Sequence, residues 1–440
     1  MQQWWEVPGH LEVKGGDLHI EGYRAQEIAD DLYPLHMGER VLFVYSTPWL
    51  RQNARDAKRE LEGADVFYAG KALELPEIVR AAAEERLGFD AVSPVEVELA
   101  LKMGIRPENV LMSYEASELG MAYAASKGVP INMNSKGQLR DFYRLVAGHP
   151  EFRGAEVMLR RNSAQEGAGW IDDNTTIGAD CKFGIREEDI VREALAAKNN
   201  GLDVAGFHHH IGSGYGPESA DVFLRHARRL AELTAEAIDS GVDTIDRIDY
   251  GGGFGVRYRG EQAFLELGDL HRRAMDMQRG VLHDRRMRAM YEPGRRIANC
   301  GVMLMRVVRT GEEYIPFIRM NAGFPDFPRP AMYGAYQHIV PVIDTLREPG
   351  REVQIAGRIC ESGDVWTGGK HAKRPMPDVK KGEWLALLNI SYGSAMRMRD
   401  YCQFPPPLDI IADGSGWHTA EPVERHVNRE HPEYFDALRD

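Results

Sequence analysis

Between residues 64 and 292, short apolar runs alternate with longer stretches in which the apolar positions have helical spacing. This alternation is typical of parallel strands that are joined by helices. Helical stretches such as Leu75–Arg86 and Glu96–Met103 separate the runs. Eight strand–helix units over this length predict an α/β fold with a (β/α)8 barrel. The eight runs are Val66–Ala69, Phe89–Ser93, Val110–Tyr114, Ile131–Asn134, Glu156–Arg161, Val204–Ile211, Arg247–Tyr250 and Arg288–Tyr291.

After Ile297 the pattern changes to shorter apolar runs that are separated by glycine and proline, as in a mostly β domain. These runs are Val302–Arg309, Tyr314–Met320, Glu352–Ala356 and Trp384–Leu388. Near the start of the chain, the strand-like segment Val41–Tyr45 is expected to join the same β domain. We therefore predict an N-terminal segment at 1–45, a barrel at 46–297 and a C-terminal β domain at 298–440.

Charge and cysteine spacing narrow the class of protein. The 440 residues have a formal charge of -13 that is spread over mixed-sign segments, so we expect no nucleic-acid partner. No apolar run approaches the roughly 20 residues that span a bilayer, and no signal segment precedes residue 10, so we expect a cytoplasmic protein without a membrane anchor. Cys181, Cys300, Cys360 and Cys402 are far apart and suggest neither a disulfide framework nor a zinc site.

Polar residues follow four of the predicted strands, where the chemistry of a barrel is found. Lys71 follows the first strand and either forms an imine with a carbonyl group or is a solvated surface lysine. The glycines Gly251, Gly252 and Gly253 follow the seventh strand and either close on a phosphate group or form a flexible turn.

The sixth predicted strand ends in three histidines. His208 and His210 would project from one face of a strand and could bind a metal ion. The other strand ends offer few carboxylate partners, so we favour an imidazole stacked on an aromatic cofactor, with Ser213 contacting its phosphate. The last strand ends in Glu292, which could keep a pyridine nitrogen protonated, and Arg295 could meet a phosphate or a carboxylate.

These segments together resemble the fold-type III pyridoxal-phosphate decarboxylases, a family with an alanine-racemase-like barrel, and most closely diaminopimelate decarboxylase. The resemblance covers nearly the whole chain and rests on Tyr68–Ala72, His208–Gly214, Asp249–Gly255, Glu292–Arg295, Arg329–Tyr333, Cys360–Asp364 and Tyr392.

The resemblance assigns roles to individual residues. It implies pyridoxal 5'-phosphate as the cofactor, Lys71 as its Schiff-base lysine and His210 as the stacked imidazole. It also implies a homodimer in which Cys360 of one subunit donates a proton in the active site of the other. The implied contacts to the phosphate and the pyridine ring are Ser213, Gly251, Gly252, Gly253, Glu292, Gly294, Arg295 and Tyr392.

The resemblance also implies a substrate with an amino group at its far end. Its contacts would be Arg295, Arg329, Tyr333, Glu361, Asp364 and Tyr392. Several motifs depart from the family pattern, among them Gly70 and Leu73 around the lysine and Cys402 where asparagine is usual. Three alternatives remain open: a decarboxylase of another basic or D-amino acid or of an amino-acid conjugate, a catalytically silent homologue, and a racemase.

Overall fold

The computed structural model describes residues 2–169, 175–283, 285–312, 314–369, 371–393, 396–398 and 401–428. Residues 429–440, the end of the predicted C-terminal domain, lie outside the described residues. The chain divides into two compact units. The sheet unit comprises Met1–Gln52, Arg257–Gln262 and Ala298–Glu421. The barrel unit comprises Asn53–Val256, Ala263–Ile297 and Pro422–Asp440.

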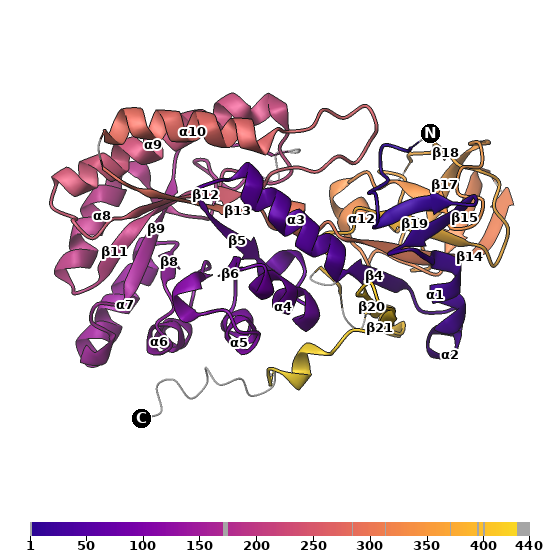
Figure 1. The fold of residues 1–440 in the computed structure, drawn as a ribbon, viewed down its shortest axis with the longest axis horizontal. Helices are drawn as coiled ribbons and strands as arrows, with labels where there is room; N and C mark the ends of the chain where they lie inside the picture. The colour runs from indigo at the N-terminus through magenta and orange to yellow at the C-terminus, as the bar shows by residue number, and fades with distance from the viewer. Residues whose placement is uncertain are drawn as a thin grey trace. The chain divides into compact units, whose positions relative to one another are not determined.

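Eight parallel strands close into a barrel, which confirms the predicted fold class (Figure 1). The strands follow the hydrogen-bonded order β9-β11-β12-β13-β5-β6-β7-β8, and a pairing of β8 with β9 closes the ring. The short strand β10 (Ile185–Arg186) also pairs with β9. The barrel strands are β5 (Asp65–Ala69), β6 (Gly88–Ala91), β7 (Val110–Met112), β8 (Ile131–Met133), β9 (Glu156–Asn162), β11 (Asp203–His208), β12 (Arg247–Gly252) and β13 (Arg288–Glu292).

The apolar runs become strands because both of their faces are buried. The side chains of β6, β7 and β8 are all buried, as expected for parallel strands between a barrel core and a layer of helices. Five buried side chains from different strands form one apolar cluster inside the barrel: Phe67, Leu111, Met158, Ala205 and Met290.

A helix follows each barrel strand, and Figure 1 shows the longer of these helices around the outside of the strands. They are α4 (Pro76–Glu84), α5 (Pro94–Lys102), α6 (Glu118–Ser126), α7 (Lys136–Gly148), α8 (Glu187–Asn199), α9 (Ala220–Asp239), α10 (Leu267–Leu282) and the short α11 (Gly294–Ala298). Serine side chains cap three of them: Ser93, Ser117 and Ser135 each accept a hydrogen bond from the backbone amide three residues later.

The sheet unit is built on a mostly antiparallel sheet in the order β18-β17-β15-β14-β4-β20-β21. Strand β4 (Leu42–Ser46) lies between β14 (Gly301–Glu312) and β20 (Leu408–Ala412), so N-terminal and C-terminal segments share one sheet. The other members are β15 (Pro316–Met320), β16 (Ile339–Pro341), β17 (Glu352–Ala356), β18 (Arg374–Pro375), β19 (Trp384–Leu388) and β21 (Trp417–Thr419).

The remaining elements of the sheet unit are short. A separate antiparallel sheet of β1 (Leu11–Lys14), β2 (Asp17–Ile20) and β3 (Tyr23–Arg24) was not expected from the sequence. Three helices complete the unit: α1 (Ala25–Asp31), α2 (Tyr33–His36) and α12 (Arg329–Tyr333). The helix α3 (Thr47–Glu60) leads from the sheet unit into the barrel unit.

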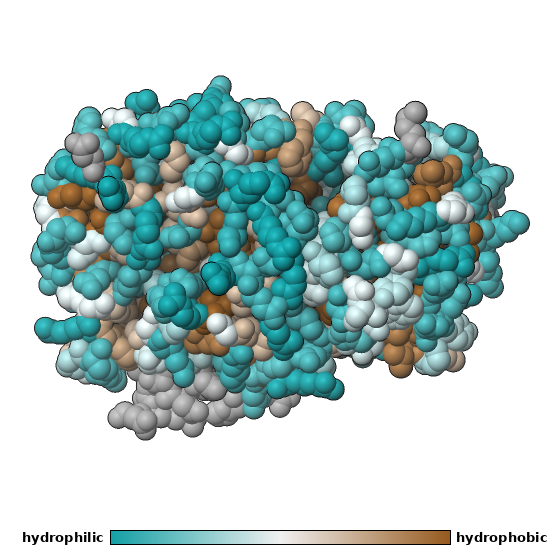
Figure 2. Space-filling view, in the orientation of Figure 1, coloured by the Kyte–Doolittle hydropathy of each residue, from teal (hydrophilic) through white to brown (hydrophobic). Residues whose placement is uncertain are grey.

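The face shown in Figure 2 is mostly hydrophilic, and its apolar side chains form separate small groups. Among the described residues, the search for a helix both long and apolar enough to cross a membrane found none.

Candidate active site

Lys71 lies in a turn of 3-10 helix directly after β5, at the carboxyl end of the barrel. The hydroxyl of Tyr68 donates to the Leu73 carbonyl at 2.7 Å, which ties this turn back to the strand. A Cβ atom at Gly70 would lie 2.3 Å from the ring of Phe89, so the residue before the lysine has no room for a side chain. Sequence and packing together therefore fix the backbone from which Lys71 projects.

An acidic residue on the neighbouring strand β6, Asp90, lies close to Lys71. The Lys71 Nζ atom lies 3.7 Å from Asp90 Oδ2, and the Asp90 side chain is fully buried. Burial and the negative charge of Glu292 raise the pKa of Asp90 to about 7, although Lys71 acts in the opposite direction. A carboxyl group that titrates near neutral pH thus lies beside the amine.

His208 at the end of β11, Asp249 within β12 and Glu292 at the end of β13 form a buried cluster. Their ligand-type atoms all lie within 4.8 Å of one another. His208 Nε2 is 3.7 Å from Glu292 Oε1, and both side chains are almost completely buried. Asp249 Oδ1 accepts a hydrogen bond from the Gly251 amide at 2.8 Å. Through Asp249, this cluster is linked to the glycine segment at the end of β12.

The two carboxyl groups of this cluster have opposite pKa shifts. Burial would raise the pKa of Glu292, but the nearby His208, Lys71 and His210 more than offset it and hold that pKa well below its usual range. Burial and the Glu292 charge raise the pKa of Asp249 well above its usual range. Glu292 is therefore the ionised member of the pair at neutral pH. Its Oε1 atom is buried and makes no hydrogen bond to any described residue.

The three consecutive histidines have different surroundings. β11 ends at His208, so the expectation that His208 and His210 share one face of a strand is wrong. His209 is fully buried, and its ring lies 5.9 to 6.2 Å from the rings of Phe223, His226 and Tyr250.

His210 is held by one neighbouring threonine. The Thr176 hydroxyl donates to the His210 carbonyl at 2.7 Å and lies 2.9 Å from Nδ1. Burial, followed by the charge of Lys71, lowers the pKa of His210 well below its usual value. The His210 imidazole is therefore neutral at pH 7 and lies within electrostatic range of Lys71.

The glycine segments after β11 and β12 lie directly against each other. Gly214 donates its backbone amide to the Gly253 carbonyl at 2.7 Å. Gly253 has φ +92, and a Cβ atom there would lie 1.9 Å from the Gly212 carbonyl oxygen. A Cβ atom at Gly251 or Gly252 would also meet backbone atoms, of His209 and Glu292 respectively, within 2.3 Å. Only glycine allows this approach of two main chains.

Ser213 and Arg295 lie beside these glycines. Arg295 Nη2 donates to the Ser213 Oγ atom at 3.0 Å, and Arg295 is only 4% exposed. Gly294, the first residue of α11, faces Ala69 of β5, where an added Cβ atom would lie 2.7 Å from the alanine methyl group. A guanidinium, a hydroxyl and glycine backbone are groups that suit a phosphate ester.

The donor set of the barrel fits pyridoxal phosphate. Glu292 Oε1 is an ionised, buried acceptor that makes no hydrogen bond within the described residues and could accept one from a pyridinium N–H. The glycine segments, Ser213 and Arg295 match the phosphate, and the amine of Lys71 matches the aldehyde.

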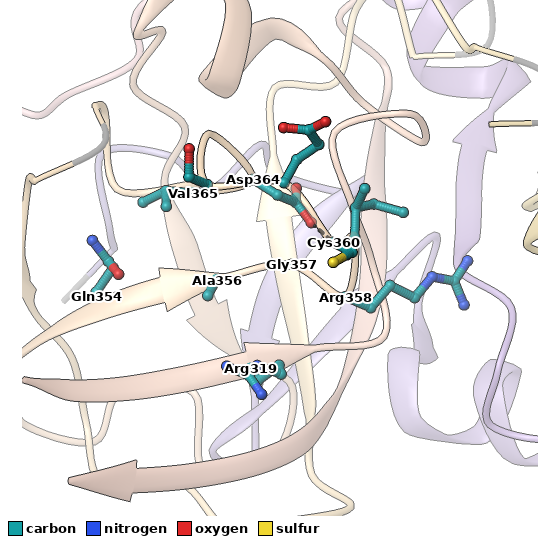
Figure 3. Close-up of a pocket in the computed structure, with 11 residues that line it drawn as sticks. Arg319, Gln354, Ala356, Gly357, Arg358, Cys360, Asp364 and Val365 are labelled. Carbon is teal, nitrogen blue, oxygen red and sulfur yellow. Dashed lines mark hydrogen bonds between the residues drawn. The ribbon is translucent and has the colours of Figure 1, made fainter. Parts of the chain in front are cut away.

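In the sheet unit, the loop after β17 carries Cys360 and Glu361, and both are exposed. A cavity of about 370 Å³ lies against this loop (Figure 3). Arg319 and Gln354 also line it, whereas the guanidinium group of Arg358 points away from these two residues in Figure 3.

Asp364 fixes the shape of the Cys360 loop. Its carboxylate accepts hydrogen bonds from the backbone amides of Ile359 at 2.9 Å and Phe324 at 2.7 Å, and the residue is 3% exposed. A Cβ atom at Gly357 would lie 2.0 Å from Asp364 Oδ2. On the rim, the Tyr401 hydroxyl donates to Glu361 Oε1 at 3.1 Å.

The other predicted substrate contacts lie elsewhere in the sheet unit. Arg329 and Tyr333 are the first and last residues of α12, and Arg329 is buried. Tyr392 follows β19 with φ +71, in the left-handed region that non-glycine residues rarely adopt.

Sequence reasoning gave no role to Asp90, Asp249 or Thr176. Both aspartates are embedded in apolar runs. A carboxylate in a buried strand needs a partner, so this position could have marked them as candidate site residues. Thr176 lies in a loop and carried no comparable signal.

Comparisons with known proteins agree with this geometry. The family model described as "Pyridoxal-dependent decarboxylase, pyridoxal binding domain" matches residues 49–299. The diaminopimelate decarboxylase of Methanothermobacter thermautotrophicus is 31% identical over 92% of this chain and 90% of its own length. That of Aquifex aeolicus is 30% identical over 93% of both chains. The crystal structure of AQ1208 from Aquifex aeolicus is 26% identical, covers 96% of this chain and 98% of its own, and has a TM-score of 0.79.

Proposed function

The chain belongs to the pyridoxal-dependent decarboxylases, and from that premise we propose that its substrate is an amino acid with a second amino group at its far end, most closely meso-diaminopimelate. The observation that carries this proposal is the exposed Glu361, which follows Cys360 in the loop and lines the same cavity. A carboxylate at that position suits a distal ammonium group. Several relatives of about 30% identity over most of the chain are named diaminopimelate decarboxylases.

Residues of the barrel unit would hold the cofactor. Lys71 would hold its aldehyde carbon through the amine, and Ser213, Arg295 and the Gly251–Gly253 segment would contact its phosphate. Glu292 would hold a proton on the pyridine nitrogen, and the neutral His210 imidazole would stack on the ring. Bound pyridoxal phosphate supplies an electron sink for the electrons released when the carboxyl group leaves. Gly294 completes the proposed phosphate contacts of the barrel unit, and the family resemblance adds Tyr392 of the sheet unit.

In this proposal, Asp90 stabilises the positive charge of the Lys71 side chain. Whenever Lys71 carries a proton, its ammonium group would lie in a partly buried site. A neighbouring carboxylate 3.7 Å away stabilises that charge and keeps the amine in place for the next turnover.

Cys360 delivers the proton that replaces the lost carboxyl group. Its thiol lies on an exposed loop whose shape Asp364 fixes through two backbone hydrogen bonds. We therefore assign Asp364 to positioning the loop, although the resemblance makes it a substrate contact. Glu361 binds the distal ammonium group, and Arg295, Arg329 and Tyr333 bind the carboxylate that is retained.

The experiment is a screen of CO2 release with the purified holoenzyme. The substrates are meso-diaminopimelate, both enantiomers of lysine, ornithine and arginine, with Lys71→Ala as the inactive control. We expect meso-diaminopimelate to give the highest kcat/KM and L-lysine as the product by mass spectrometry. A preference for arginine, which has a guanidinium group in place of the distal amino group, would contradict the proposed substrate class, and racemisation without CO2 release would contradict the reaction.

A second experiment separates the role of Glu292 from that of the fold. Glu292→Gln keeps the shape of the side chain but cannot stay ionised, so we expect the variant to bind the cofactor and to lose roughly 100-fold or more in kcat. The absorbance band of the bound cofactor reports binding, and CO2 release reports turnover.

A further inference from the structure

A cluster of cations in the sheet unit is distinct from every residue assigned above. It centres on Tyr336, whose ring centroid lies 4.2 Å from the guanidinium carbon of Arg259 and 5.5 Å from that of Arg374. Arg259 lies in the loop Arg257–Gln262, and Arg374 begins β18. Two guanidinium groups that are remote in the sequence thus converge on one aromatic ring.

Arg374 is a buried cation without an acidic partner among the described residues. It is 8% exposed, and one of its nitrogens, Nη1, donates to the Gln337 carbonyl at 2.7 Å. Its Nε and Nη2 atoms are buried and make no hydrogen bond within the described part of the chain. Burial lowers the pKa of Arg374 to about 10, although the side chain of Tyr336 acts in the opposite direction, so the group remains charged at pH 7.

The groups around this cation do not neutralise it. The Tyr336 hydroxyl lies 3.1 Å from His338 Nδ1, and burial lowers the pKa of His338 to about 4, so His338 is neutral at pH 7. Arg259 is the exposed member of the cluster, and Glu261, which is largely solvated, lies 4.0 Å from it. An exposed pair at that distance is weak, so a charge near +2 remains at the cluster.

The loop that carries Arg259 is held in place. Asn389 donates to the Arg257 carbonyl at 2.9 Å, and Gln262 accepts a hydrogen bond from the Tyr258 amide at 2.8 Å. A Cβ atom at Gly260 would lie 2.9 Å from the indole ring of Trp4. Arg259 is therefore presented from an ordered backbone, which lowers the entropy lost when it binds a ligand.

We propose that Arg259, Tyr336 and Arg374 form a binding site for a phosphate-class oxyanion, either inorganic phosphate or the phosphate group of a small ester. A buried guanidinium group with two unused donors needs an anionic acceptor, and planar guanidinium forks match phosphate oxygens in pairs. A phosphate with about 1.5 negative charges at pH 7 offsets most of the charge of the two arginines, whereas a carboxylate balances one of them. Lys373, which is exposed and adjacent to Arg374, adds positive charge on the same segment.

The test uses the holoenzyme, because the cofactor then occupies the phosphate site proposed in the barrel. The protein is freed of excess cofactor and phosphate, and calorimetric titrations are run at constant ionic strength in chloride with sodium phosphate, glycerol phosphate and acetate. We expect saturable binding of phosphate, with at least a tenfold loss of affinity in Arg259→Gln and in Arg374→Gln. Arg309→Gln, which removes an exposed arginine of the same unit, is the matched control and should bind normally.

The titration with glycerol phosphate distinguishes inorganic phosphate from a phosphate ester as the ligand. If the ester binds more tightly than phosphate, the ligand is a small phosphate ester. Arg374→Gln should also raise the melting temperature without phosphate, because it removes a buried unpaired charge. Absence of saturable binding, unchanged affinity in the Arg259→Gln variant, or equal affinity for acetate would overturn the proposal. If Arg374→Gln does not fold, the exposed Arg259→Gln variant decides the question alone.

Discussion

The Lys71 amine lies 3.7 Å from the carboxylate of Asp90, a fully buried residue on the neighbouring barrel strand. The two residues are 19 positions apart in the sequence. They meet because β5 and β6 are parallel neighbours, with Ala69 paired to Asp90 in the register. Burial and the Glu292 charge bring the pKa of Asp90 to about 7, so the charge beside the amine changes within the physiological range.

The first prediction concerns this pair. In the wild type, kcat should rise as the pH passes about 7, because an ionised Asp90 would stabilise the Lys71 ammonium group. Asp90→Asn should remove this dependence and lower kcat roughly tenfold at pH 8. The measurement is the pH profile of CO2 release, with the cofactor absorbance band as the control for binding. An unchanged profile would show that Asp90 does not act on Lys71.

The second prediction tests the contact between the two glycine segments. Gly253→Ala places a Cβ atom 1.9 Å from the Gly212 carbonyl oxygen at φ +92, so it should cost about 2 kcal/mol or more and weaken cofactor binding. Gly128→Ala is the matched control, since Gly128 has φ +69 and open space around its Cβ position. The control substitution strains only the backbone, so it should lower the free energy of unfolding by about 1 kcal/mol. Urea unfolding of both variants measures the difference in their free energies of unfolding. Equal losses of stability would argue against a rigid contact between the two glycine segments.

The third prediction concerns Glu96, a buried residue at the start of α5. Burial raises the pKa of its carboxyl group to about 8, and the Val92 amide donates to its Oε2 atom at 2.8 Å. Since the folded pKa lies above the unfolded value, stability falls as the pH rises from about 4.5 to about 8, where the contribution is lost. Glu96→Gln should flatten this slope by about 1 kcal/mol per pH unit.

Urea unfolding of the holoenzyme at pH 5, 6, 7 and 8 measures the Glu96 effect. Glu84→Gln, at an exposed position of α4, should keep the wild-type slope. A slope that is the same in all three proteins would mean that Glu96 is not buried as a neutral acid.

The barrel could be predicted from the sequence because its strands are buried on both faces, which leaves a continuous apolar run. Such a run does not mark where a strand ends. The sixth predicted run extended to Ile211, yet β11 ends at His208, although His209 and Ile211 are also buried. The glycines that follow explain why the strand does not continue, since Gly212 has φ +153 and its Cβ position is filled by the Ala168 carbonyl oxygen.

The residues around the candidate site were predictable in type but not in pairing. Lys71, Glu292 and the glycines are unusual at strand ends, so the sequence marks them. Asp90 and Asp249 were missed because their partners are set by strand order, which the local pattern does not contain. The same reason applies to β20, which returns to pair with β4 more than 360 residues away in the sequence.

The last prediction tests the homodimer implied by the family resemblance. If Cys360 of one subunit serves Lys71 of the other, a heterodimer of Lys71→Ala and Cys360→Ala subunits contains one site with both groups intact. Mixing the two inactive variants under conditions of subunit exchange should therefore restore about a quarter of wild-type CO2 release, since half of the dimers are mixed and each has one intact site. Mixing Lys71→Ala with the Lys71→Ala/Cys360→Ala double variant should restore none. Because Cys360 lies on an exposed loop ordered by Asp364, its replacement should leave the fold intact, and native mass spectrometry can verify that exchange took place. A fully exchanged mixture without activity would show that each active site takes both residues from a single chain.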